Sequence, residues 1–379
     1  MDALYTESAV KFTEKIMAWD SPTGFAETAA EKIGKEFARL GFEVHGSNKG
    51  GVIIDLGGSN ANDGILLQAH TDTLGGMVCE IKSNGRLKLA PLGGVAASVI
   101  ETEEMRVHTR DGKVFGGTFQ LCNPSIHVNG DLRDAKRDFN GMEVVLDTDV
   151  RSAEDTRKLG IEVGDIVAFE PRFRIAENGY IKSRFLDDKL SVGILYALAQ
   201  YISEKGIVPE RRTYIHITTY EEVGLGGSGP VPDGITESVS IDMGCVGDGI
   251  TCTERQVSIC AKDSAGPYSY VLTGKLINAA KERGADYAVD VYPHYGSDVE
   301  QTVRAGYDIR HGLIGPGVYA SHGYERSHYD GVANTLKVLE GYLNICKNLR
   351  PGIFLLTKSK KNDIIIVAHP WWNWQTRKI

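Results

Sequence analysis

Helix-like and strand-like segments alternate at both ends of this chain, and the alternation breaks off in the middle. Ala26–Leu40 carries apolar residues at helical spacing, and strand-like runs such as Ile65–Ala69 follow it. The pattern returns with a helix expected over Leu190–Lys205 and strands over Thr213–Thr219 and Ser238–Asp242. Alternation of this kind predicts an α/β domain built from both ends of the chain.

The middle of the chain lacks this alternation and consists mainly of short strand-like runs. Short strand-like runs, such as Met105–His108 and Met142–Leu146, are separated by Gly, Asn and Asp turns. This spacing predicts a small β-barrel or sandwich inserted into the α/β domain. The expected organisation is a discontinuous catalytic domain of residues 1–75 and 176–357, an insert of residues 76–175, and a tail of residues 358–379 with no assigned role.

Net charge, apolar runs and cysteine spacing limit the partners and cofactors expected for this chain. The net charge is −8 and there is no basic block, which argues against nucleic-acid binding. The chain starts without a recognisable secretion signal and contains no long apolar run, so we expect a cytoplasmic protein without membrane contact. Its six cysteines are scattered without a C-x-x-C pair, which favours neither a disulfide framework nor a thiolate metal site.

Two polar clusters fall at the ends of predicted elements. An apolar strand runs directly into His70-Thr71-Asp72, where an imidazole can bind a metal and a carboxylate two residues later can hold its other nitrogen. A capped strand end with a solvated histidine is the structural alternative. Asp187 and Asp188 precede a helix, where one aspartate could cap the helix and the other is left for a cation.

Two further strands also end in carboxylates. Glu221 and Glu222 follow an apolar strand, and two neighbouring carboxylates are costly to pack unless a cation or a proton compensates them. One glutamate could bind metal while the other accepts a proton from water. Asp242 ends the next strand, and His322 and His328 lie near the closing helix. Two histidines, two aspartates and a glutamate are a suitable donor set for two divalent cations.

Taken together, these segments resemble the tetrahedral, dodecamer-forming (TET-type) dinuclear metallo-aminopeptidases of the glutamyl aminopeptidase family, as a divergent member. The resemblance covers roughly residues 5–350. It rests on segments that occur in the family's order and spacing: His70-Thr71-Asp72, Leu186–Lys189, Glu221–Gly224, Ile241-Asp242, and the insert segments Arg86–Gly94 and Gly160–Asp165.

The resemblance implies a mixed-sheet α/β catalytic domain of the phosphorylase/hydrolase-like kind with an inserted β-barrel for dimerisation. It also implies two divalent cations per subunit, Zn²⁺ or Co²⁺ or else Mn²⁺, and hydrolysis of N-terminal residues from peptides. Asp187 would bridge the cations, and the peptide bond after it is often cis in related enzymes. The implied ligands are His70 and Asp242 for one cation, and Glu222 and His322 for the other.

The resemblance assigns the remaining roles as well. Glu221 would be the general base toward a metal-bridging water, and Asp72 would orient His70. This chain has Ser321-His322 where better-known members have His-Ser, so His328 competes with His322 as the ligand. Gly296, Ser297 and Asp298 are expected to line the substrate pocket.

The family forms a hollow dodecamer built from dimers, so a closed homo-oligomer is expected here. Two rival functions remain open from the sequence. One is a metal-dependent deacylase or amidase acting on modified small peptides. The other is a non-catalytic metal-binding scaffold, which would have no need of Glu221.

Overall fold

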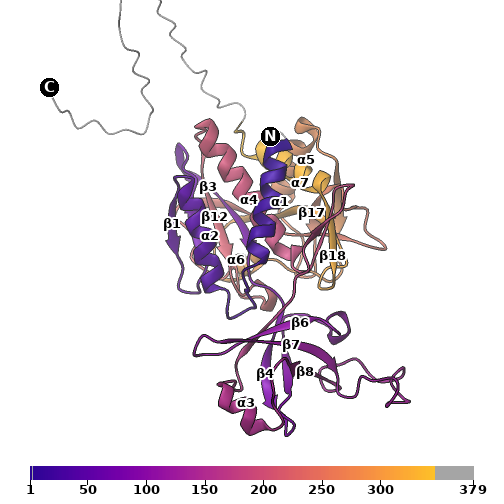
Figure 1. The fold of residues 1–379 in the computed structure, drawn as a ribbon. Helices are drawn as coiled ribbons and strands as arrows, with labels where there is room; N and C mark the ends of the chain where they lie inside the picture. The colour runs from indigo at the N-terminus through magenta and orange to yellow at the C-terminus, as the bar shows by residue number, and fades with distance from the viewer. Residues whose placement is uncertain (2, 346–379) are drawn as a thin grey trace, which may run out of the picture. The chain divides into compact units, whose positions relative to one another are not determined.

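The computed structural model describes residues 1 and 3–345 of the chain. The larger part of the described chain is built around a twelve-stranded mixed sheet (Figure 1). Its main path runs in the order β1-β2-β12-β3-β13-β17-β18-β11-β10, β14 and β15 also pair with β17, and β16 pairs with β15. The strands are β1 (Glu43–Gly46), β2 (Val52–Asp55), β3 (Asn60–His70), β10 (Arg174–Ile175), β11 (Tyr180–Ser183), β12 (Arg211–Thr218), β13 (Ile235–Ile241), β14 (Gly244–Val246), β15 (Val257–Lys262), β16 (Tyr287–Val291), β17 (Arg310–Tyr319) and β18 (Glu325–His328).

Four central strands point the same way. β3 is parallel to both β12 and β13, and β13 is parallel to β17. The carboxyl ends of these strands therefore meet along one edge of the sheet, where open α/β sheets form their sites. His70 is the last residue of β3, and the residues that follow the other three strands lie at the same edge.

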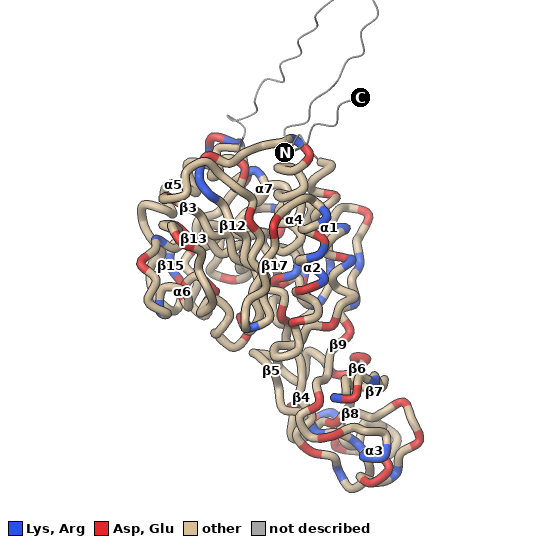
Figure 2. The backbone as a smooth tube through the Cα atoms, turned by 90° about the vertical axis from the view of Figure 1, so that its left-hand side faces the viewer, with Lys and Arg blue, Asp and Glu red and all other residues tan. Residues whose placement is uncertain are grey.

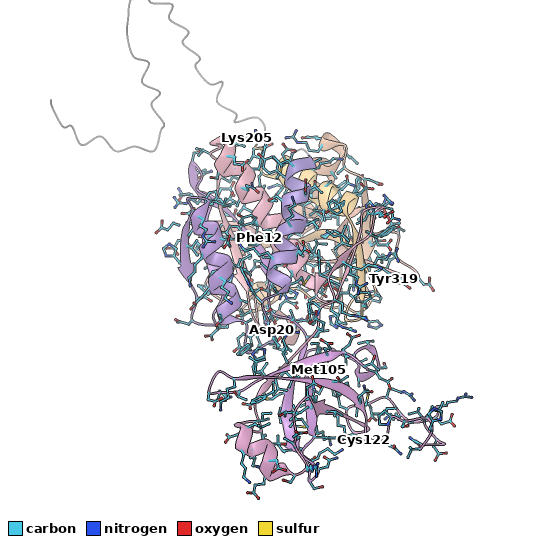
Figure 3. The ribbon with its side chains drawn as sticks, in the orientation of Figure 1. Phe12, Asp20, Met105, Cys122, Lys205 and Tyr319 are labelled. Carbon is cyan, nitrogen blue, oxygen red and sulfur yellow. The ribbon has the colours of Figure 1, made fainter. Side chains whose placement is uncertain are left out.

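The side chains of β3 divide between the two faces of the sheet. Ile65 and Leu67 belong to the main apolar core, which α1 and α4 help to form. Phe12, labelled on α1 in Figure 3, stacks on Tyr196 of α4 with ring centroids 3.8 Å apart. On the other face, Gln68 accepts a hydrogen bond of 3.2 Å from Thr302 of α6. The helices of this part are α1 (Ala3–Met17), α2 (Glu27–Arg39), α4 (Leu186–Lys205), α5 (Tyr270–Arg283), α6 (Asp298–Arg304) and α7 (Tyr329–Tyr342).

A closed six-stranded barrel interrupts the α/β part, in the order β4-β5-β8-β7-β6-β9. Its interior is filled by apolar side chains such as Val78, Val107 and Phe119. Acidic and basic residues are interspersed along the barrel and along the α/β part (Figure 2). The barrel elements are β4 (Gly75–Ile81), β5 (Leu87–Leu92), β6 (Glu104–His108), β7 (Val114–Leu121), β8 (Met142–Leu146), β9 (Ile166–Phe169) and the helix α3 (Ala153–Leu159).

The predicted fold class is confirmed, because the chain combines a mixed α/β sheet with an inserted closed barrel. The central strand β17 was not predicted. The closing helix, expected over Asn334–Asn348, begins earlier and ends at Tyr342. Arg174 and Ile175, which the predicted boundary assigns to the insert, pair with β11 of the large sheet. The predicted tail of residues 358–379 lies outside the described residues.

No helix within residues 1 and 3–345 is both long enough and apolar enough to span a membrane.

Candidate metal centre

The five predicted ligands come together at the carboxyl edge of the sheet. They lie on separate segments, and the parallel order of β3, β12, β13 and β17 explains why they meet. His70 ends β3, Asp187 lies at the start of α4, Glu222 lies in the 3₁₀ turn η2 (Glu221–Val223) after β12, Asp242 follows β13, and His322 follows β17.

Asp187 lies between the two predicted histidine ligands. Its Oδ1 is 3.1 Å from Nε2 of His70, and its Oδ2 is 3.6 Å from Nε2 of His322. Glu222 approaches the same nitrogen of His322 at 3.5 Å, and Glu221 approaches Nε2 of His70 at 3.7 Å. A carboxylate that faces one imidazole with each oxygen has the geometry of a bridging ligand.

Two overlapping groups of side chains have donor atoms close enough to share a cation. Ligand atoms of His70, Asp187 and Glu222 lie within 4.8 Å of one another, and so do those of His70, Asp188 and Asp242. Asp188 was not among the predicted ligands. One of its oxygens accepts the backbone N–H of His70, and the other is buried without a hydrogen-bond partner. Imidazole nitrogens and carboxylate oxygens suit Zn²⁺, Co²⁺ and Mn²⁺, so the residues fit the expected cations.

The electrostatics of the cluster also favour cations. Burial, followed by the charge of Asp187, raises the pKa of Glu222 to about 8 and that of Asp242 to about 7. Burial opposes ionisation of Asp187 too, but contacts with His322 and His70 hold its pKa below the ordinary value. Carboxylates packed this closely oppose one another's charge, and a positive ion removes that penalty.

Asp72, which is predicted to orient His70, contacts both His70 and the turn that follows β12. Nδ1 of His70 is 3.0 Å from the backbone carbonyl of Asp72 and 3.5 Å from its carboxylate, so the carbonyl is the nearer acceptor. The carboxylate accepts the backbone N–H groups of Glu221 and Glu222 at 3.1 and 3.3 Å, and the hydroxyl of Thr23 at 2.7 Å. Asp72 therefore holds the turn that carries both glutamates.

The backbone at the start of α4 shows whether Asp187 or Asp188 caps that helix. The residue at the N-cap position is Phe185, and no side chain caps the helix there. Asp187 and Asp188 have non-helical backbone angles, and the peptide bond between them is cis. Both carboxylates are thus free of a capping role.

The two competing histidines have different surroundings. Nδ1 of His328 accepts the backbone N–H of Asp330 at 2.9 Å and so caps α7, and its Nε2 donates to the carbonyl of Asn178 at 2.8 Å, so both nitrogens are engaged. His322 donates through Nδ1 to the carbonyl of Gly94 at 3.2 Å. That contact leaves Nε2 facing the carboxylates of Asp187 and Glu222.

A cavity of about 550 Å³ opens beside the cluster. Gly296 and Ser297, which are predicted to line the substrate pocket, line this cavity together with His294 and Tyr295. Asp298 is not among the lining residues, and its buried side chain accepts a hydrogen bond from Thr218.

Two residues that contact the predicted ligands were not predicted to have a role at the site. Gly94 comes from the insert, and Glu325 accepts backbone hydrogen bonds at Asp187 and His322. Neither a glycine carbonyl nor a glutamate within a Gly-Tyr-Glu-Arg segment gives a recognisable sequence signal.

A mixed sheet with histidine and carboxylate donors at its carboxyl edge, and an inserted barrel, define the architecture of α/β peptidases of the aminopeptidase type. Residues 50–338 match the family model described as M42 glutamyl aminopeptidase, so the chain belongs to that family and is a peptidase hydrolase.

Relatives in sequence carry the same kind of name. The chain is 40% identical over 334 residues to the "Putative aminopeptidase YhfE" of Bacillus subtilis, an alignment that covers 88% of this chain and 96% of the relative. It is 27% identical over 202 residues to a lysyl aminopeptidase of Pyrococcus furiosus, covering 53% and 56% of the two chains.

Solved structures share the fold. A TET aminopeptidase from a marine sediment Thaumarchaeota archaeon superposes with a TM-score of 0.80 at 20% identity, covering 88% of this chain and 96% of that one. The TET1 peptidase of Pyrococcus horikoshii, described as assembling into a tetrahedron or a large octahedral shell, gives a TM-score of 0.78 at 20% identity, with 89% and 99% covered.

Proposed function

We propose that this aminopeptidase works with two divalent cations per subunit, held by His70, Asp187, Glu222, Asp242 and His322. The observation that carries the proposal is the position of Asp187, whose two oxygens face His70 and His322 at 3.1 and 3.6 Å. Asp242 completes the half of the site at His70, and Glu222 completes the half at His322. When bound, the cations would polarise the scissile carbonyl and lower the pKa of the attacking water.

Glu221 is the general base in this proposal. It lies 3.7 Å from Nε2 of His70, and burial raises its pKa well above the ordinary value of a glutamate. A buried carboxylate placed beside the attacking water can accept its proton and return it to the leaving amine. Asp72 fixes the turn that places this carboxylate, because it accepts the backbone N–H groups of both glutamates.

The cavity beside the cluster is the proposed position of the first residue of the peptide. Gly296 and Ser297 leave room there, and the carboxylates around the cluster suit a free N-terminal amine. A deacylase acting on N-acylated peptides would use the same residues without an amine. Equal rates on a free and an N-acetylated peptide anilide would favour that rival function, whereas family membership supports a strong preference for the free amine.

Removal and replacement of metal tests the central proposal. Exhaustive chelation should abolish peptide hydrolysis, and about two equivalents of Zn²⁺, Co²⁺ or Mn²⁺ per chain should restore it. Metal content and hydrolysis rate are measured on the same samples. Full activity in protein shown to contain no metal would disprove the metal dependence.

We also propose a closed homo-oligomer. The support is that structural neighbours of the same fold are described as dodecamers and as tetrahedral or octahedral shells.

A further inference from the structure

Glu325 is a buried carboxylate that touches two of the proposed ligands through their backbones. It begins β18, and its residue surface is 2% exposed. One of its oxygens accepts the N–H of Asp187 at 3.1 Å, and the other accepts the N–H of His322 at 3.1 Å. A single side chain thus joins the start of α4 to the turn after β17.

That turn needs an external restraint. Tyr319 of β17 pairs with Arg326 of β18, and the turn between them contains Ala320 and His322 with φ angles of 59° and 62°. Residues other than glycine occupy this left-handed region at a cost, and they persist where surrounding contacts hold them. The hydrogen bond from His322 to Glu325 and the bond from its ring to Gly94 are two such contacts.

We propose, on the basis of the function proposed above, that Glu325 is a positioning residue for the cation held by Asp187, Glu222 and His322. Its carboxylate fixes the backbones of Asp187 and His322 relative to each other, and so fixes the distance between their donor atoms. A carboxylate suits this role because each of its oxygens accepts one N–H. A glutamine of the same size has one acceptor oxygen and would direct its amide N–H₂ at the other donor.

The test compares Glu325→Gln with Glu237→Gln. Glu237 is an equally buried carboxylate toward the other end of β13 from Asp242, where it accepts from Arg211 at 2.6 Å and from Tyr342 at 2.8 Å. Co²⁺ is titrated into metal-depleted protein in competition with a chelating dye, and the visible Co²⁺ absorption spectrum is recorded. Thermal midpoints are measured in parallel.

In Glu325→Gln, one Co²⁺ equivalent should lose about 10- to 100-fold in affinity and change its spectrum, and the other equivalent should lose less. Glu237→Gln should lower the thermal midpoint and bind both equivalents as wild type does. Wild-type binding of both equivalents by Glu325→Gln would overturn the inference. Equal losses of affinity in both variants would also overturn it, because general destabilisation would then explain the effect.

A second variant covers the case in which Glu325→Gln does not fold. Glu325→Asp keeps the charge but is one methylene shorter, so it cannot reach both N–H groups, and the same selective loss is expected. Unchanged Co²⁺ binding by Glu325→Asp would contradict the inference. Wild-type protein that binds only one equivalent would instead disprove the two-cation function on which the inference rests.

Discussion

Two neighbouring glutamates have separate proposed roles at this site. Glu221 and Glu222 share one turn, yet Glu222 approaches His322 at 3.5 Å while Glu221 approaches His70 at 3.7 Å. Asp72 accepts both of their backbone N–H groups, so the turn is fixed and the two side chains point to different halves of the cluster. The division of roles therefore depends on side-chain direction, and substitutions can separate the roles.

Glu221→Gln should keep both cations and lower kcat by about 10²- to 10⁴-fold, because only the proton acceptor is removed. Glu222→Gln, which serves as the matched variant, should lose one cation equivalent. Metal content per chain and kcat are measured on both. Loss of a cation in Glu221→Gln with full occupancy in Glu222→Gln would show that the two roles are reversed.

The choice between the two histidines is tested in the same way. His322→Ala should lower the occupancy of one cation, since its Nε2 faces Asp187 and Glu222. His328→Ala should bind both cations and lower the thermal midpoint, because it loses the cap of α7 and the hydrogen bond to Asn178. The assignment fails if metal is lost only from His328→Ala.

At the scale of elements, the sequence predicts strands whose apolar runs end in a functional residue. β3 before His70 is the clearest example, because a buried parallel strand is typically an apolar run. β17 could not be predicted, because it contains glycines and Pro316, which ordinarily indicate a turn. The contacts of Asp72 with Glu221 and Glu222, and of Glu325 with Asp187, could not be predicted either, since they join segments far apart in the chain.

Close packing explains the composition of β17. A side-chain carbon added to Gly315 would lie 1.8 Å from the backbone oxygen of Asp242, and one added to Gly317 would lie 2.1 Å from that of Thr253. The strand must therefore carry glycine where it passes the segment that presents Asp242. Glycine in a strand interior often marks such a close approach.

Gly315→Ala should destabilise the protein by about 3 kcal/mol or more, as overpacking against backbone does, and should weaken cation binding through Asp242. Gly274→Ala is the matched control, because Gly274 lies inside α5 and nothing is within 4 Å of an added carbon. That change should stabilise the helix by about 0.5–1 kcal/mol. Thermal midpoints and Co²⁺ affinity are measured on both, and a Gly315→Ala protein as stable as wild type would contradict the packing argument.

At the scale of the whole molecule, the inserted barrel and the α/β part are connected at the site. The carbonyl of Gly94, two residues after β5, accepts the hydrogen bond from His322. Arg106 of β6 pairs with Asp20, which follows α1, at 2.6 Å. The insert therefore helps to orient His322, one of the proposed ligands.

The last prediction concerns assembly. A peptidase with open active sites would degrade the accessible N-termini of other proteins, whereas enclosure in a shell limits its substrates to short peptides. Light scattering coupled to size exclusion should give a mass near twelve times the 41.3 kDa of one chain. The same preparation should hydrolyse short peptides and leave a folded protein with the same first residue intact. A stable monomer at micromolar concentration would disprove the closed assembly while leaving the metal chemistry untouched, because every proposed ligand comes from one chain.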